Sequence, residues 1–255
     1  MNQANSSPRY ARHLVLPGFT PAIQQNLTRA RVLLIGLGGL GAPAALYLAG
    51  AGVGELLLCD FDTVDITNLH RQPLYRTADI NMRKTTAAAA ALGALNPDIT
   101  LTELPRRLTA DELPAVVADA DVVVDASDNF GTRFALNAAS RATGTPLVSG
   151  AALRFEGHVT VFDPRRTDSP CYACLYAEDA EGLEDCRGNG VLGPVPGVIG
   201  SLQAAEALKL LTGLGTPLVG QLLIYNAQYG SFRSTRIARD PACPVCAVQN
   251  HHAES

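Results

Sequence analysis

The sequence RVLLIGLGGLGAPAALYLAGAGVGELLLCD, residues 31–60, contains a complete strand, turn, helix and strand signature. An apolar run leads into a glycine-rich turn, a stretch of small residues follows, and a second apolar run ends in an acid. This order is typical of the unit that binds nucleotides in open α/β sheets. Gly36, Gly38 and Gly41 form the motif G-x-G-x-x-G. Such a turn brings the backbone amides at the start of a helix close to phosphate oxygens.

Asp60 ends this unit at the spacing of an acid that binds the ribose of a nucleotide. A nicotinamide-dependent oxidoreductase carries the same signature, so the motif alone leaves two kinds of ligand open. A glycine turn that binds nothing is a third interpretation. The ordered succession of strand, turn, helix, strand and acid disfavours it.

The residues after Asp60 favour ATP over a dinucleotide. They read DFDTVDITNLHRQ from residue 60 to residue 72, and Arg83 and Lys84 follow soon after. Hydride transfer needs no such cluster, whereas a triphosphate with magnesium needs cations for its oxyanions and carboxylates for its metal. A further polar run, DASDN at residues 125–129, lies at the end of an expected strand. Acids at the carboxyl ends of parallel strands face the crevice in which ligands bind.

Apolar runs alternate with helix-like segments up to about residue 150. This alternation predicts a doubly wound, mostly parallel, Rossmann-like α/β sheet. The expected strands cover residues 31–35, 55–60, 99–104, 121–125 and 146–149, and the expected helices cover residues 40–50, 84–95, 111–118 and 133–143.

The second part of the chain follows a different pattern. Strand-like runs at 157–163, 221–226 and 231–237 surround a helix-like segment near 200–212. We expect these runs to form antiparallel strands that extend the same sheet. Residues 178–194 are rich in glycine and acids, which predicts a mobile loop.

Composition and charge exclude several classes of protein. The chain has 255 residues, is 47% hydrophobic and 17% charged, and carries a net charge of −4, which gives no indication of a nucleic-acid partner. Its N-terminus, MNQANSSPRY, does not resemble a secretory signal. The most apolar stretches contain many glycine, alanine and proline residues, which predicts buried helices and not membrane spans. We expect a cytoplasmic protein.

Four of the six cysteines form two C-x-x-C pairs, Cys171 with Cys174 and Cys243 with Cys246. This pattern suits a tetrahedral zinc site with four thiolates, which has no open position and is therefore structural. Two disulfides are the alternative, and the absence of a secretory signal disfavours them. Cys186 lies beside Arg187 in EDCRGNG, where a reactive thiolate and an ordinary loop cysteine both remain open, since the preceding acids oppose a low pKa.

Six motifs form a combined pattern that spans nearly the whole chain. They read GLGGLG, DFDTVDITNLHRQ, RKT, ASDN, LVSGAALRFEGHVTVF and CRGNGVLGPVPGVIGSLQAAEALKLL. Together they resemble the bacterial ubiquitin-activating-like superfamily of ThiF, MoeB and HesA type. The resemblance implies ATP-dependent adenylation of the C-terminal glycine carboxylate of a small ubiquitin-fold sulfur carrier, with release of pyrophosphate.

The resemblance also implies roles for single residues. Asp60 binds the ribose, and Asp128 holds magnesium. Arg12 matches an arginine that reaches the nucleotide of the partner subunit, which implies a homodimer. Cys186 matches a cysteine linked to covalent sulfur transfer in the thiamine branch. The residues implied to contact the nucleotide are Gly36, Gly38, Gly39, Gly41, Asp60, Asp62, Thr67, Asn68, Arg71, Lys84, Asp128 and Asn129.

The resemblance divides the chain into an N-terminal helical arm (1–30), a nucleotide-binding half (31–150) and a carrier-binding half with the zinc site (151–248). His70 departs from the family, which usually has glutamine there. No sulfurtransferase-like domain follows Cys246, so we expect a separate sulfur donor such as a cysteine desulfurase or a rhodanese.

Three functional questions remain open at this stage. A nicotinamide-dependent oxidoreductase would leave Arg71, Lys84 and Asp128 without a role. A non-catalytic scaffold that binds the carrier would be expected to have lost some of these charged residues. The motifs also divide between the molybdopterin branch and the thiamine branch, so the carrier and its pathway stay undecided.

Overall fold

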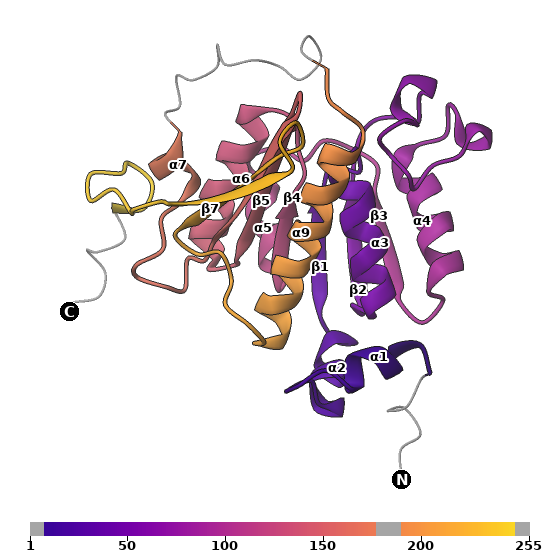
Figure 1. Cartoon of the computed structure of the whole chain (residues 1–255), viewed down its shortest axis with the longest axis horizontal. Helices are drawn as coiled ribbons and strands as arrows, with labels where there is room; N and C mark the ends of the chain where they lie inside the picture. Colours follow the sequence, from indigo (N-terminus) through magenta and orange to yellow (C-terminus); the bar gives the residue numbers. More distant parts are fainter. Residues whose placement is uncertain (1–7, 177–189, 248–255) are drawn as a thin grey trace.

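The computed structural model describes residues 8–176 and 190–247, in which eight strands form one mixed sheet (Figure 1). The strand order is β3-β2-β1-β4-β5-β6-β7-β8. The first five strands are parallel to their neighbours, and the last three continue the sheet in antiparallel fashion. This arrangement confirms the predicted α/β fold with an antiparallel extension. The strands are β1 (Arg31–Ile35), β2 (Glu55–Cys59), β3 (Thr100–Leu104), β4 (Val122–Asp125), β5 (Leu147–Leu153), β6 (Glu156–Phe162), β7 (Gln221–Asn226) and β8 (Ser231–Arg236).

Helices cover both faces of the sheet. The core on one face joins α3, α4 and α9 to the strands, and the core on the other face joins α5, α6 and α7. In β1, Val32 and Leu34 face the first core while Leu33 and Ile35 face the second, because side chains alternate along a strand. The helices are η2 (Pro8–Tyr10), α1 (Ala11–Leu14), α2 (Pro21–Leu27), α3 (Gly41–Ala51), η3 (Ile66–Asn68), η4 (Thr77–Asp79), α4 (Lys84–Leu95), α5 (Leu113–Ala118), α6 (Phe130–Thr143), α7 (Tyr172–Leu175) and α9 (Pro194–Thr212).

Two elements are longer than the sequence predicted. Strand β5 continues to Leu153 because it pairs with β6 over all seven of its positions, whereas its pairing with β4 ends at Ser149. Helix α9 begins at Pro194, about six residues before the expected start. The expected loop, residues 178–194, overlaps α9 only at Pro194, since residues 190–193 lie outside any helix. Prolines are tolerated in the first turn of a helix, where backbone N–H groups have no intrahelical partner. Residues 178–189 of that expected loop lie outside the described residues.

Helix α9 packs directly on the start of α3. A Cβ on Gly200 would overlap the carbonyl oxygen of Leu40, so the two backbones approach as closely as glycine allows. Gly197 lies one turn earlier in α9, and a Cβ there would meet open space. Within the described part of the chain, no helix has both the length and the apolar character needed to cross a membrane.

We expect Gly200→Ala to destabilise the protein by about 1–3 kcal/mol, because the added methyl group must push α9 away from α3. Gly197→Ala is the matched control, and it should stabilise the helix by about 0.5–1 kcal/mol. Urea unfolding of both variants measures the difference. Equal stabilities would contradict the close backbone contact between α9 and α3.

Candidate functional site

The glycine-rich turn connects β1 to α3 at the carboxyl edge of the sheet. Gly36 has a φ of +89°, and a Cβ there would lie 2.7 Å from the carbonyl oxygen of Ala126. A Cβ on Gly41 would overlap the carbonyl oxygen of Gly36. Both positions therefore require glycine. At Gly39, a Cβ would lie 3.0 Å from Cβ of Pro196, so the start of α9 encloses the turn from a second side.

Asp60 fixes the shape of this turn. Its Oδ2 accepts a hydrogen bond from the amide of Leu37 at 2.7 Å, and its Oδ1 accepts one from the amide of Asp62 at 2.8 Å. The buried hydroxyl of Tyr75 donates to the carbonyl oxygen of Leu37 at 2.8 Å. Each carboxylate oxygen of Asp60 has a second lone pair that can accept a hydrogen bond from a ligand hydroxyl.

Two cations lie beside the loop that follows β2. Lys84, the first residue of α4, is 5% exposed, and its Nζ lies 2.9 Å from Oδ2 of Asp62. Asp62 itself is exposed, so an anion can compete for the ammonium group from the solvent side. Arg71 donates from Nη1 to the carbonyl oxygen of Thr67 at 2.9 Å and lies 2.8 Å from Nε2 of His70.

The short helix η3 sets the positions of Thr67 and Asn68. Asp65 caps this helix, because its Oδ1 accepts hydrogen bonds from both Oγ1 and the amide of Thr67. These two hydrogen bonds lower the pKa of the Asp65 carboxyl group. Asn68 donates from Nδ2 to Oγ1 of Thr67 at 3.4 Å.

Asp128 follows β4 at the same edge of the sheet and is exposed. Its neighbour Asn129 caps α6, because its Oδ1 accepts a hydrogen bond from the amide of Thr132 at 2.9 Å. The amide oxygen of Asn129 is thus engaged within the protein. The Asp128 carboxylate, in contrast, is exposed to solvent and is an oxygen ligand of the kind that hard metal ions prefer.

The structure brings most of the predicted nucleotide residues to one edge of the sheet. β2, β1 and β4 are neighbours, and the Gly36 turn, Asp60 and Asp128 each follow the carboxyl end of one of them. The loops that carry Asp62, Thr67, Asn68, Arg71 and Lys84 extend from β2 along this edge.

Arg12 is not part of this group within one chain. The ring of Tyr10, two residues earlier, lies against Gly52 at the C-terminal end of α3, whereas the glycine-rich turn lies at the N-terminal end of that helix (Figure 1). The eleven residues of α3 separate the two ends by about 16 Å. Cys186 lies outside the described residues.

A set of buried polar side chains lies beneath the Asp128 loop. Sequence reasoning expected Asp125 to face the ligand crevice, which was wrong, and it missed Arg133 and Gln203. Asp125 is fully buried, Arg133 is 9% exposed, and Gln203 of α9 is fully buried. The signal for Arg133 lies in the periodicity of α6, where Arg133, Leu136 and Ser140 all face the core. A charged residue at a position that the helical repeat assigns to the interior indicates a buried polar network.

Four cysteines form a compact cluster beside α6. Their Sγ atoms all lie within 4.8 Å of one another, with Cys171 3.9 Å from Cys174, Cys171 3.6 Å from Cys243, and Cys174 3.5 Å from Cys246. A tetrahedral zinc ion with Zn–S bonds of about 2.3 Å separates its sulfur atoms by about 3.8 Å. All four cysteines are free, so the disulfide alternative is not supported.

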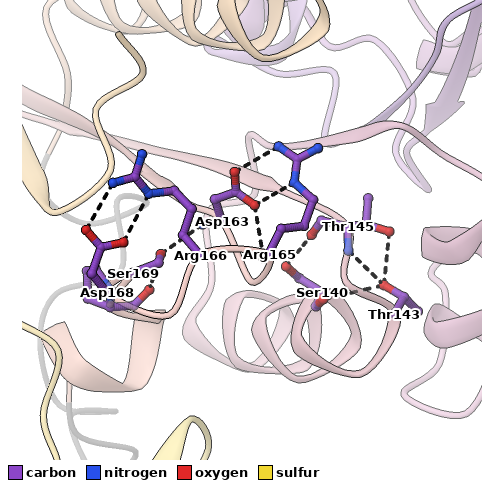
Figure 2. Close-up of polar contacts among 9 residues, drawn as sticks. Ser140, Thr143, Thr145, Asp163, Arg165, Arg166, Asp168 and Ser169 are labelled. Carbon is purple, nitrogen blue, oxygen red and sulfur yellow. Dashed lines mark hydrogen bonds and ion pairs between the residues drawn. The ribbon is translucent and has the colours of Figure 1, made fainter. Parts of the chain in front are cut away.

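The segments around the cysteines are held by ion pairs and hydrogen bonds. In the loop before Cys171, Arg165 binds Asp163 through both Nε and Nη2 at 2.8 Å, and Arg166 binds Asp168 in the same manner (Figure 2). After β8, Arg239 donates to the carbonyl oxygens of Thr167 and Cys246. The hydrogen bond from Arg239 to Thr167 joins the segments of the two C-x-x-C pairs, although the pairs are 72 residues apart.

The sheet order, the glycine-rich turn and the loops at its carboxyl edge define a Rossmann-like α/β protein. The chain belongs to the ThiF family, whose sequence model matches residues 10–245. This finding confirms the family expected from the motifs.

Two relatives are similar over almost their whole length. The sulfur carrier protein ThiS adenylyltransferase of Escherichia coli strain K12 is 47% identical over 242 residues, which cover 95% of this chain and 96% of the relative. The molybdopterin-synthase adenylyltransferase of Salmonella typhimurium strain LT2 is 46% identical over 238 residues, which cover 93% and 95%. Among solved structures, E. coli MccB with ATP has a TM-score of 0.83 and 25% identity, covering 96% of this chain and 75% of that chain.

We expect the untagged protein to contain about one zinc ion per chain, and a chelator should lower its melting temperature because metal binding contributes to folding free energy. Cys174→Ser should lose most of the zinc in elemental analysis. Cys59→Ala is the matched control, since the free, buried Cys59 lies in β2 outside the cluster, and it should keep the metal. A stable, metal-free wild-type protein would refute the zinc site.

Proposed function

We propose that this chain uses ATP to adenylate the C-terminal glycine carboxylate of a small ubiquitin-fold sulfur carrier and releases pyrophosphate. The main support is the convergence of a glycine-rich turn, an acid for ribose, two cations and an exposed carboxylate at one sheet edge. The names of the relatives from E. coli and Salmonella support a sulfur carrier as the acceptor of the adenylyl group. The crystal structure of MccB with ATP supports ATP as the nucleotide.

In this proposal the chain binds and orients two anionic reactants. The turn at Gly38 and Gly39 approaches the phosphates, and Asp60 accepts a hydrogen bond from the ribose. Lys84 and Arg71 neutralise phosphate oxygens, with Lys84 exchanging its partner Asp62 for the nucleotide. The carrier carboxylate is ionised at neutral pH and attacks the α-phosphorus without a general base. Catalysis then rests on positioning and electrostatic stabilisation.

Asp128 is the residue we assign to magnesium. Its exposed carboxylate is a hard oxygen ligand, whereas the amide oxygen of Asn129 caps α6. A magnesium ion bound there would neutralise negative charge on the phosphates and on the pyrophosphate leaving group. Asn129 therefore acts on the site mainly by fixing the start of α6.

An exposed apolar surface next to the site supports a protein acceptor. Phe155 in the β5–β6 turn is 48% exposed, Leu192 is 45% exposed, and Tyr229 and Phe232 around the β7–β8 turn are 75% and 56% exposed. These segments adjoin, because the amides of Leu192 and Ala227 donate to the carbonyl oxygens of Arg154 and Phe155 at 2.8 Å. The surface lies at the carboxyl edge of β5 and β7, the edge of the nucleotide residues. Apolar patches of this kind mark sites of protein association.

The alternatives receive less support. A nicotinamide-dependent oxidoreductase leaves the cations and Asp128 without a role, and a silent scaffold does not explain why all of them are present. The choice between molybdopterin and thiamine pathways stays open, because the two relatives differ by one percentage point in identity.

The remaining proposals rest on sequence motifs. Cys186 is our candidate for covalent transfer of sulfur to the carrier, and a cysteine desulfurase or a rhodanese is the proposed donor. A cytoplasmic location also stays a prediction. Arg12 is proposed to complete the nucleotide site of a partner subunit, which agrees with the position of its segment at the C-terminal end of α3, away from the glycine-rich turn.

Asp128→Ala should reduce carrier-dependent ATP–pyrophosphate exchange by about a hundredfold or more, because an electrostatic group is lost from the transition state. The fold should persist, since the Asp128 side chain is exposed. Asp111→Ala removes another exposed acid and serves as the control, with exchange near the wild-type rate. Near-wild-type exchange in Asp128→Ala would refute the magnesium role.

Mixing Arg12→Ala protein with Asp128→Ala protein should restore part of the exchange activity. Heterodimers of these chains contain one composite site with both native residues, provided that the subunits exchange. Each variant mixed with itself is the control and should stay inactive. If a heterodimer verified by mass spectrometry shows no recovery, Arg12 does not act across a dimer.

A further inference from the structure

Two buried charges that the proposed chemistry does not use lie directly beneath Asp128. Asp125 ends β4 with no exposed surface, and Arg133 reaches back toward it from the first turns of α6. Burial raises the pKa of the Asp125 carboxyl group, and the positive charge of Arg133 opposes that rise. Buried charges are costly unless they are paired and hydrogen-bonded, so this arrangement requires a structural reason.

The two charged side chains hold the same residue from opposite sides. Oδ1 of Asp125 accepts hydrogen bonds from the amide and the hydroxyl of Ser127, at 3.0 and 2.6 Å. Nη2 of Arg133 donates to the carbonyl oxygen of Ser127 at 2.7 Å and to that of Gly150 at 3.4 Å. The peptide unit that leads into Asp128 is therefore fixed to β5 by a single guanidinium group.

A third buried side chain holds the start of the same loop from the opposite face of the sheet. Nε2 of Gln203 donates to the carbonyl oxygen of Asp125 at 2.6 Å and to that of Val148 at 3.3 Å. Gly150 leaves space for this amide, because a Cβ there would lie 2.5 Å from Cδ of Gln203. The backbone from Asp125 to Ser127 is thus restrained at the carbonyl oxygen of Asp125 and at the amide and carbonyl oxygen of Ser127, while the Asp128 side chain remains exposed.

Helix α6 is itself anchored by the segment from Cys171 to Cys174, which we call the cysteine knuckle. The ring of Tyr172, between Cys171 and Cys174, packs edge-on against Phe134 with ring centres 5.1 Å apart. Oδ1 of Asn137 accepts a hydrogen bond from the amide of Tyr172 at 2.9 Å. Burial raises the pKa of the Tyr172 hydroxyl to about 12 against the opposing charge of Arg133. The knuckle therefore docks on the face of α6 that carries Arg133.

We propose that Arg133 is a positioning residue for the magnesium ligand: it fixes the Ser127 carbonyl and thereby the direction in which Asp128 leaves the sheet. Arginine suits this role because its guanidinium stays protonated and its Nη2 carries two hydrogens, one for each carbonyl oxygen. This inference rests on the role proposed for Asp128. According to this inference, Arg133 contacts neither the nucleotide nor the carrier.

Arg133→Met in the full chain tests the inference with two independent measurements. Hydrogen exchange of the amides at 126–129, followed by mass spectrometry, should become at least about tenfold faster because the loop loses a restraint. The magnesium concentration for half-maximal carrier-dependent ATP–pyrophosphate exchange should rise at least fivefold, with the zinc content unchanged. Arg133→Lys keeps the charge beside Asp125 and should give intermediate values, and it carries both measurements if Arg133→Met does not fold.

Arg165→Met is the matched control. It removes an arginine that also holds a buried acid, Asp163, but at the opposite edge of the sheet (Figure 2). Both measurements should match the wild type. A folded Arg133 variant with wild-type amide exchange and magnesium requirement would overturn the inference, as would a loss of stability without either change. If the wild-type protein shows no carrier-dependent exchange, the proposed function fails, and amide exchange alone still decides whether Arg133 fixes the loop.

Discussion

The glycine-rich turn lies in backbone contact with its neighbours, and the remaining structure depends on that close approach. A side chain on Gly36 would collide with Ala126 after β4, and one on Gly41 would collide with Gly36 itself. Gly200 of α9 makes the third contact, against Leu40. Because no side chain separates these segments, the loop after β4 and the start of α9 are held at a fixed distance from the turn. The position of Asp128 relative to the turn follows from this packing.

Charged residues at the carboxyl edge divide into two groups by burial. Asp60, Asp125 and Arg133 are buried and use their hydrogen bonds to shape backbone. Asp62 and Asp128 are exposed and are free to exchange partners with solvent or ligand. Lys84 belongs to both groups. Its side chain is buried, but its Nζ forms an ion pair with the exposed Asp62. A site of this type holds its geometry with one set of charges and leaves a second set free to exchange partners.

The sequence predicted most strands, the sheet type and the family because these depend on local signals. Apolar runs, glycine spacing and C-x-x-C pairs are each contained in a few residues, and the four cysteines do form one cluster. The network of Asp125, Arg133 and Gln203 escaped sequence reasoning because it joins residues up to 78 positions apart through single hydrogen bonds. The start of α9 was expected near residue 200 because residues 178–194 are rich in glycine and acids, but Pro194 and Pro196 lie in the first turn of the helix, where proline is tolerated. The roles of the individual site residues remain predictions.

Strand β5 connects the Asp128 loop rigidly to the exposed apolar surface around Phe155. It pairs with β4 in parallel on one side and with β6 in antiparallel fashion on the other, so the strand beside the Asp128 loop also supports the turn that carries Phe155. The two regions are joined by a continuous ladder of backbone hydrogen bonds and not by a linker. Hinge motion needs a few residues that absorb large changes of φ and ψ, and a paired strand does not provide them. A protein bound at the Phe155 surface therefore meets the nucleotide edge as one rigid body, and any adjustment between them falls to loops and side chains.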